Sequence, residues 1–214
     1  MFSLKPYFRA ASLFLLLAGL FLSSGRAEAE PIRILAFGDS LTAGYGLPQE
    51  DGFVPQLQKA LDKMGREALV INGGVSGDTT AGGVARLDWM LADKPDLVIL
   101  ELGANDALRG LDPAEARRNL ETIILRLKET GAKILLAGML APRNMGEDYA
   151  TAFDGMYPDL ANTHGLELYP FFLEGVATKP ELNQGDGLHP TKEGVAVIVE
   201  GILPHLTKML DQTS

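Results

Sequence analysis

The chain has 214 residues, of which 46% are hydrophobic and 22% are charged, a composition typical of a globular protein. This length is enough for one domain with a substantial core. The formal net charge of −9 argues against nucleic acid or an anionic membrane as a main partner, and the absence of cysteine excludes disulfides and cysteine catalysis.

The first 29 residues differ from the rest of the chain and match a secretory signal peptide. Lys5 and Arg9 precede an apolar run over residues 10–22, and Ala27-Glu28-Ala29 fits an A-x-A cleavage site. The alternative is a membrane anchor, which needs an apolar run of about 20 residues. The run over residues 10–22 is shorter than that. We therefore expect cleavage after Ala29, no stable membrane insertion of the mature chain, and a periplasmic or secreted protein with a net charge of −11.

Beyond residue 29, short apolar runs alternate with longer segments of helical periodicity. The runs are nearly continuous in Val, Ile and Leu, as expected of strands that are covered on both faces. The predicted strands are residues 32–37, 68–72, 97–102, 133–139 and 167–169. The predicted helices are residues 53–64, 81–92, 113–129, 149–164 and about 191–210. This alternation predicts parallel βαβ units in an open, doubly wound α/β sheet, and a single domain over residues 30–214.

Ligands of such sheets bind beyond the carboxyl ends of the strands, where this sequence gathers glycine, small polar residues and acids. A serine hydrolase needs a hydroxyl, a base that takes its proton, and a group that orients the base. Beyond residue 29 the serines are Ser40, Ser76 and Ser214, and the histidines are His164, His189 and His205. His164 and His205 lie in predicted helices, where each has a structural explanation.

His189 is distinguished by its context, Asp186-Gly187-Leu188-His189-Pro190. A tight turn can bring the Asp186 carboxylate onto one imidazole nitrogen and leave the other nitrogen as a proton acceptor. The alternative is an ordinary turn in which the aspartate caps the loop and the histidine is solvated. The spacing alone leaves both interpretations open.

Ser40 follows the first predicted strand, where its hydroxyl could cap a helix or act as a nucleophile. The G-x-S-x-G pattern of the nucleophile elbow is absent around Ser40 and Ser76, which argues against the usual α/β-hydrolase. Gly77 could offer a backbone N–H, and Asn105 a side-chain amide, to the oxyanion of an acyl-transfer reaction. Each could instead serve only its own turn, because glycine and asparagine favour left-handed backbone.

Four sequence blocks occur in a fixed order: GDSLTAGYG, NGGVSGDTTAGG, ELGANDALRG and DGLHP. With these blocks, and over nearly all of residues 32–210, the chain resembles the SGNH (GDSL-type) hydrolases. Within them it is similar to the periplasmic esterases described as acyl-CoA thioesterase I, lysophospholipase or arylesterase. The resemblance implies a flavodoxin-like three-layer α/β/α sandwich with a five-stranded parallel sheet.

The resemblance also implies roles for single residues. Ser40 would be the nucleophile, His189 the base and Asp186 its partner. The backbone N–H groups of Ser40 and Gly77 and the side chain of Asn105 would form the oxyanion hole. Neither a metal nor a cofactor would be needed.

Three other positions in these sequence blocks bear on the resemblance. Ala104 stands where many relatives carry a second glycine, and its methyl group could narrow the site without removing a donor. Asp39 and Asp106 are expected to hold loops by hydrogen bonds and to take no part in the chemistry.

The implied reaction is hydrolysis of acyl esters and thioesters, such as arylesters, lysophospholipids and acyl-CoA, through an acyl-Ser40 intermediate. One alternative is a carbohydrate acetyl esterase on the same scaffold. Another is a binding protein with a relic site, which the joint presence of Ser40, Asp186 and His189 argues against. We expect a monomer whose partners are small-molecule substrates.

The acyl group requires an apolar trough, for which the loops 78–83, 140–149 and 171–176 are candidates. The candidate substrate-binding residues are Asp78, Leu140, Met145 and Phe172, with Met139 as a further wall. The alternative is that some of these side chains simply belong to the core.

Overall fold

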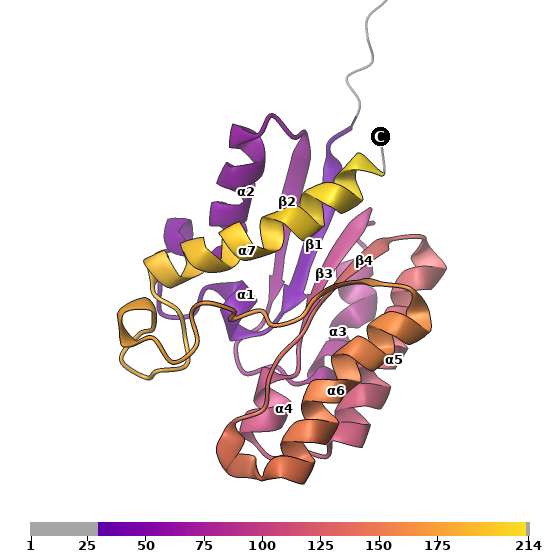
Figure 1. Ribbon diagram of the computed structural model, residues 1–214. Coiled ribbons are helices and arrows are strands. Elements are labelled where there is room, and N and C mark those ends of the chain that lie inside the picture. Colours follow the sequence, from indigo (N-terminus) through magenta and orange to yellow (C-terminus); the bar gives the residue numbers. More distant parts are fainter. Residues whose placement is uncertain (1–29, 213–214) are drawn as a thin grey trace, which may run out of the picture.

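A computed structural model describes residues 30–212 of the chain. Its centre is a five-stranded, all-parallel sheet in the order β2-β1-β3-β4-β5 (Figure 1). The strands are β1 Ile32–Gly38, β2 Ala68–Gly74, β3 Leu97–Glu101, β4 Lys133–Ala137 and β5 Glu167–Tyr169. All five lie where the sequence predicts them.

Helices cover both faces of this sheet and complete three layers (Figure 1). The long helices are α2 Phe53–Lys63, α3 Thr80–Leu91, α5 Pro113–Thr130, α6 Glu147–His164 and α7 Lys192–Asp211. On one face α2 packs against α7, and on the other face α5 contacts both α3 and α6. Each helix begins and ends within two residues of its predicted bounds. The predicted flavodoxin-like α/β/α fold is therefore confirmed.

Local sequence signals fix the ends of these helices, as α5 illustrates. Asp112 caps its start by accepting the backbone N–H of Ala114 at 2.9 Å, and Pro113 occupies the first helical position. Gly131, with a φ of 82°, ends the helix in the left-handed conformation that glycine adopts at low cost. Such caps explain why the predicted bounds are close to the observed ones.

The strand order reverses between β1 and β3, because the chain leaves β1 for β2 and then crosses back to β3. In doubly wound sheets this reversal opens a crevice at the carboxyl ends of the strands. Two short helices begin there, α1 Ser40–Ala43 after β1 and α4 Ala104–Leu108 after β3. The helix α4 was not predicted, because five residues are too few to show a helical period.

Three single-turn 3₁₀ helices lie in the loops, at Gln49–Asp51, Arg143–Met145 and Pro180–Leu182. The predicted signal peptide, residues 1–29, lies outside the described residues and stays a prediction. Within residues 30–212, none of the helices combines the length and the apolar character needed to cross a membrane.

Candidate active site

Ser40 is the first residue of α1, directly beyond the carboxyl end of β1. Its neighbour Asp39 caps this helix, because Asp39 Oδ1 accepts the backbone N–H of Leu41 at 3.0 Å. Gly44 ends the helix after one turn with a φ of 81°. The Ser40 hydroxyl is therefore not the helix cap, and it lies at the edge of the sheet with 8% of the residue exposed.

His189 reaches Ser40 from a loop 149 residues further along the chain. Its Nε2 lies 2.9 Å from Ser40 Oγ, and its Nδ1 lies 2.7 Å from Asp186 Oδ2. The other oxygen of Asp186 accepts the backbone N–H groups of Leu188 and His189 at 2.9 and 3.0 Å. Gly187 closes this turn with a φ of 68°. The turn thus brings a serine hydroxyl, an imidazole and a carboxylate into one line of contacts.

The same hydrogen bonds set the charge of Asp186. The backbone N–H and the side chain of His189, followed by the backbone N–H of Leu188, lower the pKa of Asp186 to about 2. Asp186 is therefore a carboxylate at neutral pH, which is the form that can orient an imidazole and stabilise its positive charge.

All three histidines contact a carboxylate, which the sequence did not reveal. His164 Nε2 lies 3.0 Å from Glu121 Oε1, and His205 Nδ1 lies 2.9 Å from Glu167 Oε1. Within residues 30–212, the ring of His189 alone contacts a serine hydroxyl at its second nitrogen. This second contact, rather than the nearby carboxylate, distinguishes His189 from the other two histidines.

Asn105 approaches the same point from α4, at the carboxyl end of β3. Its Nδ2 donates a hydrogen bond to Asp39 Oδ2 at 3.0 Å and carries a second hydrogen that this bond does not use. Asp39 is fully buried, and this burial raises its pKa to about 6. Asp39 thus fixes the residue after Ser40 with one carboxylate oxygen and the amide of Asn105 with the other.

Asp106, the neighbour of Asn105, fixes the start of α3. Its two oxygens accept the hydroxyl of Thr80 at 2.6 Å and the backbone N–H of Thr80 at 2.8 Å. The expectation that Asp39 and Asp106 hold loops by hydrogen bonds is confirmed.

Gly77 lies in an exposed turn after β2 with a φ of 81°. Its carbonyl oxygen accepts a hydrogen bond from Arg109 Nη2 at 2.7 Å, and Arg109 directly follows α4. This bond joins the turn that carries Gly77 to the helix that carries Asn105. Arg109 was not predicted as a site residue, because the only sequence signal for it is its position inside the ELGANDALRG block.

Tyr45 is a second site residue that was not predicted. Its ring lies against the ring of His189, with the centroids 4.5 Å apart and the planes tilted by 39°. Gln184 joins the two loops, because its Nε2 donates to the Tyr45 carbonyl at 2.8 Å and its backbone N–H donates to the His189 carbonyl at 2.7 Å. The imidazole is thus held on one face as well as at both nitrogens.

A cavity of about 510 Å³ opens beside Ser40, Asn105 and His189. Its wall is mainly apolar, and Leu108, Met139, Leu140, Phe171, Leu173 and Leu188 contribute to it. This volume lies in the range of small-molecule binding sites. Of the four predicted substrate-binding residues, Leu140 belongs to this wall.

The other three predicted substrate-binding residues do not line the cavity. Phe172 is fully buried, and its ring packs edge-on against Phe53 with the centroids 5.1 Å apart, so this prediction is wrong. The carboxylate of Asp78 accepts a hydrogen bond from Arg86 Nε of α3 at 2.6 Å, so it holds its loop to that helix. Met145 packs beside Gly110.

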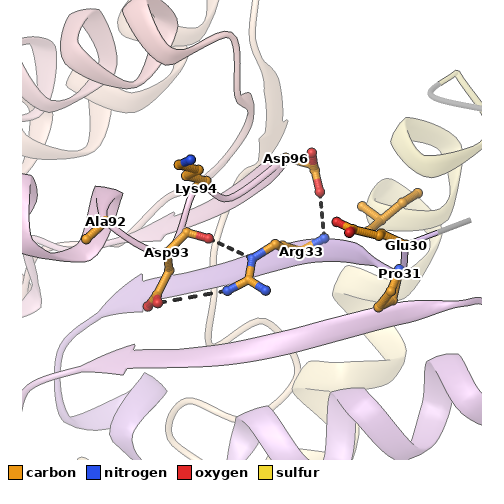
Figure 2. A pocket seen from close by; sticks show the side chains of 8 residues that line it. Glu30, Pro31, Arg33, Ala92, Asp93, Lys94 and Asp96 are labelled. Carbon is orange, nitrogen blue, oxygen red and sulfur yellow. Dashed lines mark hydrogen bonds and ion pairs between the residues drawn. The ribbon is translucent and has the colours of Figure 1, made fainter.

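A second cavity, of about 590 Å³, lies at the opposite end of the sheet, where β1 begins (Figure 2). Arg33 crosses it and engages its polar groups, since Nε donates to the Asp93 carbonyl at 2.6 Å and the backbone N–H donates to Asp96 at 2.8 Å (Figure 2). Neither serine nor histidine lines it. Across residues 30–212, no three His, Asp or Glu side chains are grouped so as to hold a metal ion.

Comparisons with known proteins show the family to which the sequence is similar. The sequence model of the GDSL-like lipase/acylhydrolase family matches residues 36–197. An arylesterase of Vibrio mimicus is 43% identical over 192 residues, which cover 89% of this chain and 96% of the relative. Thioesterase 1/protease 1/lysophospholipase L1 of Escherichia coli strain K12 is 36% identical over 182 residues, which cover 85% and 86% of the two chains.

A solved structure extends this similarity to three dimensions. The crystal structure of AlinE4, an esterase of the SGNH-hydrolase family, matches with a TM-score of 0.72 and 50% sequence identity. The match covers 85% of this chain and 97% of AlinE4.

Proposed function

The chain belongs to the GDSL-like lipase/acylhydrolase family, and we propose that it is a serine esterase and thioesterase that works through an acyl-enzyme on Ser40. The observation that carries this proposal is the unbroken line of contacts from Asp186 through His189 to Ser40, beside an apolar cavity. An activated hydroxyl next to an apolar cavity suits a substrate with a carbonyl carbon at one end of an acyl chain.

The first step acylates Ser40. His189 Nε2 takes the proton of the Ser40 hydroxyl while Oγ attacks the carbonyl carbon of the ester or thioester. The contact of 2.9 Å between Nε2 and Oγ is already within the reach of proton transfer. Asp186 holds the imidazole at Nδ1 and stabilises the positive charge that develops on it.

The tetrahedral intermediate carries a negative oxygen that needs hydrogen-bond donors. We assign this role to the backbone N–H groups of Ser40 and Gly77 and to the free hydrogen of Asn105 Nδ2. Asp39 supports the assignment for Asn105, because its bond to the other amide hydrogen orients the side chain before substrate binds.

Acylation is complete when the C–O or C–S bond of the intermediate breaks and the imidazolium of His189 gives its proton to the leaving alcohol or thiol. The second step releases the acid and begins when a water molecule enters. His189 takes a proton from this water as the water attacks the acyl-Ser40 carbonyl. The acid leaves, the proton returns to Ser40, and all of these proton transfers use groups of this chain.

The substrates proposed here are small acyl esters and thioesters: arylesters, acyl thioesters such as acyl-CoA, and lysophospholipids. The names of the relatives support this range, since one is an arylesterase and another a thioesterase and lysophospholipase. The signal-peptide pattern of residues 1–29 supports a location in the periplasm or outside the cell. We expect the mature protein to act as a monomer.

A substrate panel tests the proposal. Purified protein is offered p-nitrophenyl esters, an acyl thioester, a lysophospholipid and an acetylated glycan. We expect hydrolysis of the first three, loss of all three activities in Ser40→Ala, and full activity in the matched control Ser76→Ala. Cleavage of the acetylated glycan alone would replace this proposal with a carbohydrate esterase.

A further inference from the structure

A carboxyl group that the proposed reaction does not use is buried beneath Ser40. Glu101 is the last residue of β3, pairs with Gly38 of β1, and has 0% of its surface exposed. Its Oε2 accepts the backbone N–H of Asp39 at 3.2 Å and the hydroxyl of Thr42 at 2.8 Å. Its Oε1 has no hydrogen-bond partner within residues 30–212.

Burial of a carboxyl group with one unpartnered oxygen is unfavourable, and a hydrophobic side chain of the same size would fill the space at lower cost. The backbone nevertheless makes room for this group. A Cβ atom at Gly38 would overlap the Thr42 hydroxyl, a Glu101 carboxyl oxygen and the backbone carbonyl of Glu101, so a glycine before Asp39 and Ser40 lets β3 and these two side chains approach closely. Because a buried carboxyl group with an unpartnered oxygen packs less favourably than an apolar side chain, the two hydrogen bonds to Asp39 and Thr42 are what a glutamate supplies at this position.

The two groups that Glu101 holds lie on either side of the nucleophile. Asp39 directly precedes Ser40, and Thr42 follows it by two residues within the same helical turn. One oxygen of Glu101 thereby ties both sides of α1 to the end of the central strand β3. A helix of four residues has too few internal hydrogen bonds to hold its own orientation, so external contacts must fix it.

We propose that Glu101 is a positioning residue that fixes the α1 turn through Asp39 and Thr42 and so sets the direction of the Ser40 hydroxyl toward His189. The inference rests on the proposed function, since it concerns how the nucleophile of that reaction is held. Through Asp39, the same carboxyl group also supports Asn105, whose amide donates to Asp39 Oδ2.

The charges around Glu101 favour its neutral form. Burial, followed by the carboxylate of Asp39, raises the pKa of Glu101 well above its usual range. Two further ionisable groups lie on neighbouring helices. Burial, followed by the charge of Glu101, raises the pKa of Tyr157 of α6, and Arg86 of α3 donates from Nη2 to the Gly38 carbonyl at 2.8 Å. In its neutral form Glu101 still accepts both hydrogen bonds at Oε2.

Two substitutions at Glu101 separate this role from packing. Glu101→Gln keeps a neutral acceptor oxygen, and Glu101→Leu keeps a similar volume without an acceptor. We expect Glu101→Leu to lower kcat by about tenfold or more with KM within about twofold, and to slow reaction of Ser40 with a phosphonate by the same factor. Glu101→Gln should restore kcat to within about threefold of wild type, with a pH profile of the same shape, because the amide oxygen still accepts both hydrogen bonds.

A second pair of substitutions, at Thr42, tests the same hydrogen bond if the Glu101→Leu variant does not fold. Thr42→Val removes the hydroxyl that Glu101 accepts without changing the shape of the side chain, and Thr42→Ser retains it. We expect the valine variant to slow acylation of Ser40 and the serine variant to stay close to wild type. Ile124→Val, in the buried part of α5, serves as the control for a loss of packing outside these contacts.

Three outcomes would overturn the inference: wild-type kcat in Glu101→Leu, equal activities in Thr42→Val and Thr42→Ser, or an equal loss in Glu101→Gln and Glu101→Leu. The wild-type protein is measured in the same series. Failure of the wild type to react with the phosphonate at Ser40 would count against the proposed function instead, which keeps the two claims separate.

Discussion

The side-chain amide of Asn105 donates a hydrogen bond to Asp39 at 3.0 Å, so the residue before the proposed nucleophile also orients the proposed oxyanion donor. The other oxygen of Asp39 holds the backbone N–H of Leu41, the residue after Ser40. Because Asp39 is fully buried, both bonds act in a medium of low polarity, where they are stronger than in water. The two halves of the site, on β1 and β3, are therefore coupled through one carboxyl group.

Asn105→Ala removes the proposed side-chain donor. If Asn105 binds the oxyanion, kcat should fall by about 10²–10³-fold, because the donor acts in the transition state. Steady-state kinetics on a p-nitrophenyl ester measure this, and Asn144→Ala, at an exposed asparagine in the Arg143–Met145 turn, is the control. A much smaller loss in a well-folded variant would make Asn105 a loop residue only.

Asp39→Asn tests the raised pKa of Asp39. The folded protein binds the Asp39 proton with a pKa of about 6, against 3.8 for an ordinary aspartate, so this group favours folding at low pH and loses that contribution as pH rises through about 6. The variant lacks this titration. Its free energy of unfolding relative to wild type should therefore improve by about 2 kcal/mol between pH 4.5 and 7.5. Urea unfolding at both pH values measures the difference, and a constant difference contradicts the assignment.

Arg109→Gln tests the link between the Gly77 turn and α4. Loss of the bond from the guanidinium to the Gly77 carbonyl should loosen a proposed oxyanion donor and lower kcat by about tenfold with little change in KM. Arg109→Lys should recover part of this loss, because it keeps a charged donor. Arg66→Gln, at a surface arginine paired with Asp211, is the matched control and should have wild-type kinetics. Equal kinetics in the Arg109 and Arg66 variants would show that the link has no role in turnover.

The cavity beside Ser40 predicts a dependence on acyl-chain length. Ala177 lies in its wall, and Ala177→Phe should reduce kcat/KM for long p-nitrophenyl esters while leaving the acetate ester nearly unchanged. Phe172→Leu alters the core beside the cavity wall, so it should lower stability without changing the preference for length. Indifference of both the wild type and Ala177→Phe to chain length would count against an acyl site in this cavity.

The fold could be predicted from the sequence because its signals are local. Nearly continuous apolar runs marked the buried parallel strands, and caps such as Asp112 and Gly131 marked the helix ends. The spacing of three residues allowed the contact between Asp186 and His189 but left a solvated histidine equally open, and the resemblance to the SGNH hydrolases favoured the contact that the structure has.

The remaining features depend on contacts between distant segments. The pairs Tyr45–His189 and Arg109–Gly77 join loops whose relative positions no local pattern specifies. Phe172 was assigned to the acyl cavity because the loop 171–176 is apolar, but only the packed structure shows that Phe172 faces Phe53 while its neighbours reach the cavity.

Labelling of the protein with an organophosphonate, followed by peptide mapping, tests most directly whether Ser40 is the nucleophile. A fluorophosphonate reacts rapidly with a serine whose proton a neighbouring base removes, and slowly with an ordinary serine. We expect one adduct, on the peptide that contains Ser40, no adduct in Ser40→Ala, an unchanged adduct in Ser76→Ala, and labelling slowed by about 10³-fold or more in His189→Ala. Folded wild-type protein that carries no adduct on Ser40, or that carries it on Ser76, would contradict the account.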